Sequence, residues 1–215
     1  MSPTLRITEI FLSLQGEART VGCPTVFVRL TGCPLRCGYC DTAYAFTGGE
    51  LRSLDVILGQ VVALGVRYVT VTGGEPLAQP GCRMLLEALC DAGFRVSLET
   101  SGALDIADLD PRVSVVMDLK TPGSGETHRN RWENIDCLKS IDQVKFVICN
   151  RSDYEWARYK IDEYRLIDRV ADVLFSPVAA DLAPRELADW IVADRLPVRF
   201  QLQLHKLLWG DVPGR

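Results

Sequence analysis

Several features that would place the chain in a specialised class are missing from its sequence. No apolar run approaches the roughly 20 residues that a membrane-spanning helix requires, so no membrane partner is expected. Residues 1–6 contain no apolar core of a secretory signal, which favours a cytoplasmic protein. The net charge of −4 gives no reason to expect a nucleic-acid partner.

Internal repeats, long linkers and a glycine-rich phosphate-binding motif are also absent. The 215 residues, of which 47% are hydrophobic and 24% charged, fit one globular domain that spans residues 1–215. A Rossmann-type sheet is the second candidate for the fold, but the glycine-rich motif that should follow its first strand is missing.

What is present is a regular alternation of strand and helix patterns. Strands are predicted in an N-terminal hairpin and then along the rest of the chain, at residues 7–14, 26–30, 68–72, 95–99, 113–117, 143–148, 173–175 and 198–204. Helices are predicted at residues 53–64, 81–92, 131–139 and 184–193, and after a capping box formed by Ser152 and Glu155.

This alternation implies an α/β fold with a parallel sheet. The pattern gives about six βα steps, fewer than the eight of a complete barrel, which usually takes ~250 residues. We therefore predict a partial, splayed βα barrel of about six strands, related to the TIM barrel but not closed.

The chain has eight cysteines, which at this length indicate metal binding in a reducing compartment rather than a disulfide framework. Three of them, Cys33, Cys37 and Cys40, follow Cys-x3-Cys-x2-Cys spacing in one short stretch. Thiolates are soft ligands that suit zinc or an iron–sulfur cluster. Four others lie in apolar segments and are predicted to be buried side chains: Cys82, Cys90, Cys137 and Cys149.

The number of ligands near these three cysteines separates two kinds of metal site. A structural zinc ion normally has four ligands. The next candidates downstream are Cys82 and His128, both distant along the chain, whereas Cys23 lies upstream and stays open as a fourth ligand. A [4Fe–4S] cluster normally takes four cysteines, so three would leave one iron open to a small molecule.

Polar residues also collect where predicted strands end. They lie at residues 73–75, 99–101, 118–120 and 176–177. In parallel α/β folds the carboxyl ends of the strands carry the functional site. Arg29 interrupts the apolar run 26–30, so it is either a solvated residue or an inward-facing guanidinium that binds a ligand carboxylate.

The cysteine spacing, the aromatic Tyr39 before the last cysteine and the sequence Gly-Gly-Glu-Pro at residues 73–76 resemble the radical S-adenosylmethionine (SAM) superfamily. The resemblance implies that Cys33, Cys37 and Cys40 hold a [4Fe–4S] cluster whose open iron binds SAM. It also implies reductive cleavage of SAM to a 5′-deoxyadenosyl radical, in an abbreviated barrel of the radical SAM type.

Five further stretches resemble the 7-carboxy-7-deazaguanine synthase family. They are residues 14–17, the strand ending near Arg29, and residues 40–42, 98–102 and 203–206. This resemblance implies a lyase that converts 6-carboxy-5,6,7,8-tetrahydropterin to 7-carboxy-7-deazaguanine with loss of ammonia, for queuosine and related deazapurine pathways. It further implies Mg2+, a homodimer and an electron donor such as flavodoxin.

The same resemblance implies roles for individual residues, none of them assigned as catalytic. The hydroxyl of Thr42 would bind Mg2+, and Glu17 and Glu99 would position ring nitrogens of the pterin. The pterin contacts would be Leu14, Gln15, Gly16, Arg29 and Thr72. The SAM contacts would be Tyr39, Cys40, Asp41, Gly74, Asp118, Leu119, Lys120, Phe175, Ser176, Pro177 and Val178.

Two alternatives stay open on the sequence. One is a radical SAM activase that abstracts hydrogen from a partner protein. The other is a zinc-binding module without catalysis, with Cys23 as the fourth ligand. His205 either faces the site or caps a strand, and no substrate contact is assigned to the residues after it.

Overall fold

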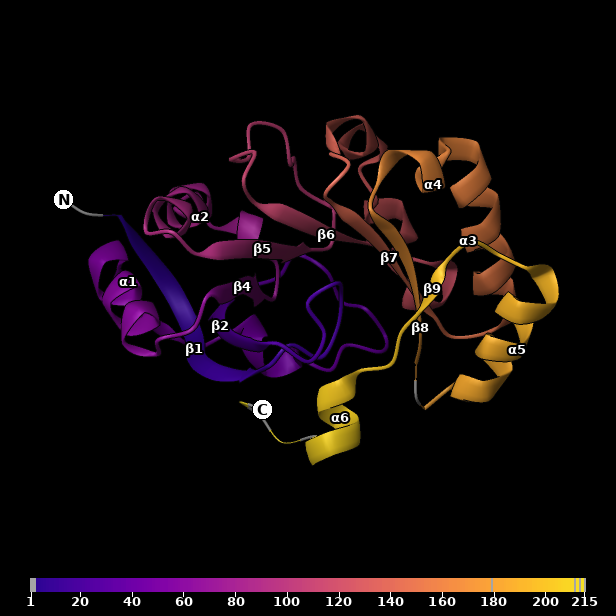
Figure 1. Ribbon diagram of the computed structural model, residues 1–215, viewed down its shortest axis with the longest axis horizontal. Coiled ribbons are helices and arrows are strands. Elements are labelled where there is room, and N and C mark those ends of the chain that lie inside the picture. Colours follow the sequence, from indigo (N-terminus) through magenta and orange to yellow (C-terminus); the bar gives the residue numbers. More distant parts are fainter. Residues whose placement is uncertain (1–2, 179, 211, 213, 215) are drawn as a thin grey trace.

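The computed structural model describes residues 3–178, 180–210, 212 and 214 and places them around one open, mixed sheet of nine strands (Figure 1). The strand order is β3-β1-β2-β4-β5-β6-β7-β8-β9. The strands are β1 (Thr4–Leu14), β2 (Pro24–Leu30), β3 (Glu50–Ser53), β4 (Tyr68–Gly73), β5 (Arg95–Thr100), β6 (Ser114–Leu119), β7 (Gln143–Ile148), β8 (Asp172–Pro177) and β9 (Arg199–Phe200).

The topology of the sheet confirms the predicted open βα barrel. Strands β1, β2 and β3 form an antiparallel group at one edge, whereas each later neighbour pairs in parallel with the strand before it. From β2 to β9 the strands follow chain order without a reversal, unlike the Rossmann sheet, in which the order reverses. All carboxyl ends of the parallel strands therefore meet at one rim.

The helices pack in two groups, at the two ends of the curved sheet (Figure 1). One core joins α1 and α2 to β1, β2, β4 and β5, and the other joins α3, α4 and α5 to β6, β7 and β8. The α-helices are α1 (Leu54–Ala63), α2 (Cys82–Asp91), α3 (Arg151–Tyr164), α4 (Leu166–Arg169), α5 (Pro184–Asp194) and α6 (Leu204–Trp209). The 3-10 helices are η1 (Ala43–Phe46), η2 (Pro76–Ala78), η3 (Pro122–Ser124), η4 (Thr127–Arg129) and η5 (Trp132–Cys137).

Strand β4 shows how the sequence separates core from site. Val69 and Val71 are buried in the core beneath the helices. The alternate residues, Thr70 and Thr72, point to the opposite face, where their hydroxyls bond polar side chains. Because successive side chains of a strand face opposite sides, one β-branched run supplies both an apolar core face and a polar inner face.

Most helix boundaries agree with the sequence, but the cap of α3 does not. The Ser53 hydroxyl caps α1 by accepting a hydrogen bond from the Val56 amide at 3.4 Å, as predicted. The predicted capping box of Ser152 and Glu155 is wrong, because Asn150 caps α3 and accepts from the Asp153 amide at 3.0 Å. Asn150 has extended backbone directly after β7, so the helix begins earlier than the box required.

The predicted strand at 198–204 is present but much shorter than predicted. Strand β9 is only two residues long, and α6 begins at Leu204. The chain leaves the sheet because the Leu204 amide donates to the Gly16 carbonyl at 3.0 Å, which draws it across the β1–β2 turn. The predicted helix at 131–139 is the 3-10 helix η5, and Cys137 at its end is exposed rather than buried.

The other three cysteines predicted to be buried, Cys82, Cys90 and Cys149, are buried. Within the described ranges, no helix combines the length and apolar character needed to cross a bilayer.

Candidate active site

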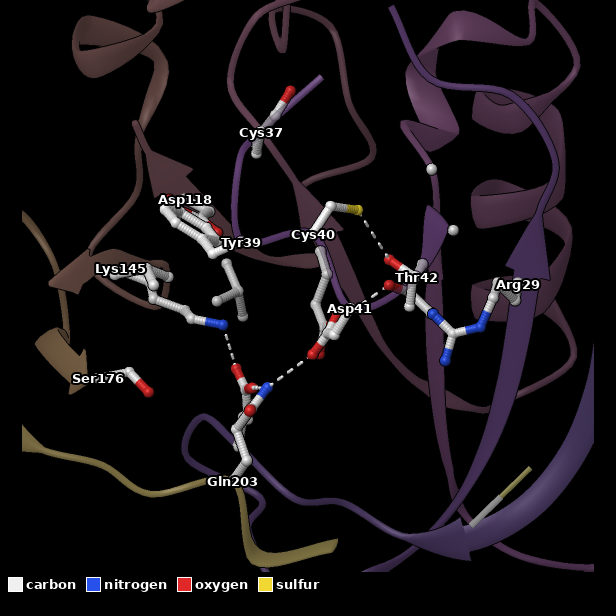
Figure 2. Close-up of a pocket in the computed structure, with 18 of the residues that line it drawn as sticks. Arg29, Cys37, Tyr39, Cys40, Asp41, Thr42, Asp118, Lys145, Ser176 and Gln203 are labelled. Carbon is white, nitrogen blue, oxygen red and sulfur yellow. Dashed lines mark hydrogen bonds and ion pairs between the residues drawn. The ribbon is translucent and has the colours of Figure 1, made fainter. Parts of the chain in front are cut away.

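A cavity of about 270 Å³ opens at the rim formed by the carboxyl ends of the parallel strands. Three segments enclose it besides the strands themselves: the β1–β2 turn, the loop after β2 and the segment after β9. Figure 2 shows Asp41 of the loop after β2 and Gln203 of the segment after β9 pointing toward each other in this space. We call residues 32–42 the cysteine loop and residues 201–206 the C-terminal segment.

The cysteine loop brings Cys33, Cys37 and Cys40 to the same cavity wall. Its backbone is held from outside by a hydrogen bond from the Gly38 amide to the Ser124 carbonyl at 3.1 Å. Arg36 donates to the Cys33 and Leu35 carbonyls at 2.7 and 2.6 Å, which fixes the turn between the first two cysteines. These hydrogen bonds fix the shape of the loop.

The three thiols suit a thiolate-binding group. Burial raises the pKa of the Cys33 and Cys37 thiols, and neighbouring Cys40 adds to that effect. A metal that binds thiolates must therefore displace protons from them, so its binding becomes tighter as the pH rises. Three inward cysteines in one cavity fit a cluster with one open iron.

Cys23 lies too far away to be a fourth ligand. It directly precedes β2, whereas Cys33 follows the other end of that strand. A strand rises roughly 3.3 Å per residue, so the length of β2 separates the two cysteines by about 20 Å. The zinc site that uses Cys23 is therefore excluded.

The Gly-Gly-Glu sequence at the end of β4 supports the cysteine loop and does not only leave space for a ligand. A Cβ on Gly74 would overlap the Gly32 carbonyl oxygen, so glycine is required for the cysteine loop to pack there. Glu75 is fully buried and accepts from the Ser101 amide and hydroxyl at 2.7 and 2.5 Å. It also accepts from Thr100 at 2.9 Å, which ties the ends of β4 and β5 together.

Most of the residues expected to contact SAM line the cavity beside the cysteines. Those that do are Tyr39, Cys40, Asp41, Gly74, Asp118, Lys120, Ser176, Pro177 and Val178. Leu119 and Phe175 are fully buried in the core and do not line it, so their side chains are not available there.

Two of these residues carry polar atoms that await a partner. The Tyr39 hydroxyl and one oxygen of Asp118 are buried without a hydrogen-bond partner among the described residues. Figure 2 shows Tyr39 and Asp118 close together on one wall. The other oxygen of Asp118 accepts from Lys120 at 3.0 Å. Since buried polar groups are normally satisfied, this wall fits a polar ligand.

The residues expected to bind the substrate surround the opposite side. Leu14, Gln15, Arg29 and Thr72 line the cavity. The Gln15 amide donates to Thr70 at 3.0 Å and Glu99 at 3.4 Å, and is almost fully buried. Gly16 lies behind them, where a Cβ would overlap the imidazole of His205.

Arg29 faces the site but is not without a partner. Its Nε donates to Glu9 at 2.7 Å, and only 14% of its side chain is exposed. Tyr44 donates to the same Glu9 oxygen at 2.9 Å. The pair offsets the cost of burying the guanidinium, so a substrate anion is not needed for that purpose. Glu9 contacts the Nε of Arg29, so the outer edge of the guanidinium, with its two terminal nitrogens, points toward the cavity, as Figure 2 shows.

Sequence reasoning missed Lys145, the cation in a cluster of charges on the wall that bears Glu17 and Glu99. Lys145 extends from β7 and pairs with Glu17 of the β1–β2 turn. Burial favours neutral Glu17, but Lys145 and the amide of Gln203 outweigh it and hold the Glu17 pKa below its ordinary value. Burial works against charged Lys145 too, yet Glu17 and Asp118 raise its pKa. Both groups are therefore ionised at neutral pH.

Glu99 lies in a contrasting environment. Burial raises its pKa, and the nearby charge of Glu17 adds to that effect. Thr72 donates to Glu99 at 2.9 Å, and Lys145 favours its ionised form without forming an ion pair with it. The pKa values of the two carboxyl groups that the family resemblance connected with the pterin ring are thus shifted in opposite directions.

The C-terminal segment completes the cavity. Gln203, His205 and Lys206 all line it, so His205 faces the site rather than capping a strand. Burial lowers the pKa of His205 below its ordinary value. Thr42 also lines the cavity, with its hydroxyl 3.8 Å from the Cys40 sulfur.

Comparison with known proteins now connects this geometry to a family. Residues 27–142 match the family model described as the radical SAM superfamily. The chain is 44% identical over 209 residues to 7-carboxy-7-deazaguanine synthase of Chlorobaculum tepidum, covering 96% of this chain and 94% of that protein. It is 42% identical over 219 residues to the protein of the same name from Koribacter versatilis, covering 95% and 97%.

A solved structure supports the fold. The crystal structure of QueE from Escherichia coli superposes with a TM-score of 0.75 and covers 94% of this chain and 95% of that one. Its sequence identity is 24%, so this likeness shows the fold alone.

Proposed function

The chain belongs to the 7-carboxy-7-deazaguanine synthase family of the radical SAM superfamily, and from that membership we propose that it is the lyase for which the family is named. The substrate would be 6-carboxy-5,6,7,8-tetrahydropterin, converted to 7-carboxy-7-deazaguanine with loss of ammonia. The observation that carries this proposal is one cavity that joins three inward cysteines to an opposite wall of amide, carboxyl and guanidinium groups.

Cys33, Cys37 and Cys40 would hold the [4Fe–4S] cluster. When bound, the cluster and SAM supply the 5′-deoxyadenosyl radical that begins the chemistry. The buried Tyr39 hydroxyl and the free oxygen of Asp118 would accept polar contacts from SAM, with Lys120 holding Asp118 in place.

The opposite wall would bind and orient the pterin. Arg29 would bind its carboxylate through the outer edge of the guanidinium, while Glu9 fixes that group from behind. Ionised Glu17 would accept from ring N–H groups, and Gln15 and Glu99 would meet the remaining polar edge. Fixing the ring in this way matters because hydrogen abstraction requires near-contact geometry.

Thr42 would bind Mg2+ together with oxygens of the substrate, since magnesium is often held by few protein ligands plus substrate. We expect Mg2+ to accelerate turnover and Thr42→Ala to reduce that acceleration about tenfold while the iron content stays unchanged. Initial rates across a magnesium titration measure this. Full activity with an unaltered magnesium response in Thr42→Ala would assign the metal to another oxygen.

We further propose that the enzyme is a cytoplasmic homodimer that takes its electron from a small donor protein such as flavodoxin. Its product would enter queuosine or related deazapurine synthesis.

The proposed activity is tested by anaerobic incubation of the reconstituted protein with SAM, dithionite and 6-carboxy-5,6,7,8-tetrahydropterin. Mass spectrometry should detect 7-carboxy-7-deazaguanine and deoxyadenosine, and the product should be absent when the pterin lacks its carboxyl group. Deoxyadenosine without any deazapurine from the carboxylated pterin would contradict the proposed substrate.

A further inference from the structure

The C-terminal segment contacts both walls of the cavity at once. On one wall it reaches Glu17, which follows the residues expected to bind the pterin. On the other it reaches Asp41, which follows the last cluster cysteine and is expected to border SAM. A single side chain, Gln203, makes both contacts.

The geometry of Gln203 is that of a bridge. Its amide nitrogen donates to Glu17 at 2.8 Å and to Asp41 at 3.2 Å, and Figure 2 shows the bond from Gln203 to Asp41. An amide nitrogen carries two hydrogens, so these two bonds use both of its donors. Among the described residues no other side chain is hydrogen-bonded to both carboxylates.

The bridge joins two like charges. Asp41 forms an ion pair with Lys206 at 3.0 Å, so it enters the bridge as a carboxylate. Glu17 is also held ionised, and each carboxylate disfavours the charge of the other. Each has its own cation, Lys145 for Glu17 and Lys206 for Asp41. Gln203 is thus the neutral donor placed between two separately paired anions.

We propose that Gln203 is a positioning residue that couples pterin binding to SAM binding. The proposal rests on the proposed function, because it takes Glu17 as part of the pterin site and Asp41 as part of the SAM site. A ligand that fixes one carboxylate fixes the shared amide and, through it, the other carboxylate. The second ligand then meets a wall that is already ordered, which is positive coupling.

Two neighbours serve as matched controls because each contacts one side only. Lys206 pairs with Asp41 at 3.0 Å and has no recorded contact with Glu17. Gln201 donates to Glu17 at 3.3 Å and accepts from the Ala18 amide at 2.5 Å, without reaching Asp41. Loss of either contact weakens one site, whereas loss of Gln203 removes the connection between the sites.

The test measures SAM affinity by calorimetry with and without 6-carboxytetrahydropterin, on protein with an oxidised cluster and no reductant, so that neither ligand reacts. In the wild type we expect the pterin to tighten SAM binding by a factor on the order of 10, within the usual range of coupling between sites. By reciprocity, SAM should tighten pterin binding by the same factor.

Gln203→Ala and Gln203→Glu should both reduce this factor to within about twofold of unity. The second variant keeps the size of the side chain but replaces the donor with a third carboxylate, so it separates hydrogen bonding from packing. Lys206→Ala should weaken SAM binding with and without pterin by similar amounts and keep the factor. Gln201→Ala should weaken pterin binding but leave the coupling factor unchanged.

Circular dichroism and iron content establish that each variant is folded and loaded before the titrations. A wild-type factor of one, or a factor unchanged in both Gln203 variants, would overturn the coupling. So would equal loss of the factor in Lys206→Ala, because the effect would then not depend on the bridge. Failure of the proposed function is distinguishable, since the wild type would then form no deazapurine from the carboxylated pterin.

Discussion

Two walls of the same cavity differ in how they are built. The cysteine loop is a contiguous stretch of residues 32–42. Its backbone is fixed by the hydrogen bond from Arg36 to the Cys33 carbonyl and by the Glu75 amide, which donates to the Gly32 carbonyl at 2.8 Å. The opposite wall joins Glu17, Lys145 and Gln203, and the Glu17–Gln203 contact spans 186 positions of the chain. The first wall is one continuous loop that a few distant contacts support, such as the hydrogen bond from Gly38 to Ser124. The second wall consists of side chains that meet only in the folded protein.

The largest contrast is expected from removing single cysteines. Cys37→Ala should abolish the cluster, because a cluster held by two thiolates lacks the usual ligand set. Cys23→Ala is the control at the far end of β2 and should retain it. Iron and sulfide content after anaerobic reconstitution, together with the visible spectrum, measures both. Equal loss in the two variants would mean that the cysteine loop is not the whole ligand set.

A second prediction concerns the wall opposite the cysteines. Lys145→Met leaves Glu17 without its cation in a position where only 11% of the carboxylate side chain is exposed. Removing one partner of a buried ion pair typically destabilises a protein by about 3–5 kcal/mol. Urea denaturation should show a loss of about this size, and pterin binding should weaken at least tenfold.

The control for this prediction is the double variant Lys145→Met with Glu17→Gln, which removes both charges. It should recover at least half of the lost stability because no buried charge is left unpaired. If the single and double variants are equally unstable, Lys145 contributes through packing of its alkyl chain rather than through the ion pair.

These two walls also show how far the sequence could predict the site. The cysteine spacing and the polar residues after strands are local patterns, and the structure places most of them at one rim. Arg29 stands out because a charge interrupts an apolar strand, a pattern that leaves a solvated and a ligand-binding side chain both open. Lys145 carries the same signal in β7, and its significance was missed because no partner is visible nearby in the sequence.

The fold was predicted from the same kind of local pattern, and its failures have a common cause. Alternating strands and helices predicted the open sheet, since each element is visible within a few residues of chain. The end of β9 and the start of α6 were not predictable, because hydrogen bonds from Leu204 to Gly16 and from Gln203 to Glu17 turn the chain there. Those partners lie at the opposite end of the sequence.

Arg29 lies on the wall opposite the cysteines, so its replacement tests whether the pterin is oriented by the guanidinium. Arg29→Lys keeps the charge but loses the planar fork that binds a carboxylate through two bonds. We expect the ratio of deoxyadenosine to deazapurine to rise about tenfold, because a misplaced substrate reacts less efficiently with the radical. Chromatography with mass detection gives both products in one sample.

The Glu9 pair supplies the control for Arg29. Glu9→Gln frees the guanidinium from its ion pair without removing it, so it should change the product ratio less than Arg29→Lys does. If Arg29→Lys leaves both the ratio and the pterin affinity unchanged, then Arg29 serves only the structural pair with Glu9.

The smallest effect is expected from the pH dependence of stability. The folded protein raises the pKa of Glu99 above its ordinary value of 4.5, chiefly through burial and then through the charge of Glu17. The folded state therefore holds this proton more tightly than the unfolded chain, and stability falls as the pH rises from 4.5 through the folded pKa. In the Glu99→Gln variant this side chain cannot ionise, so the fall in stability with rising pH should be absent. Thermal melts between pH 5 and 8 should show a smaller pH-dependent decrease of Tm in the variant, by on the order of 2 °C for a domain of this size.

The pKa of Glu17 is shifted in the opposite direction. Its lowered pKa gives a stabilising contribution that disappears only below pH 4.5, so Glu17 does not interfere in this window. Parallel curves for the two proteins across this range would contradict the raised pKa of Glu99.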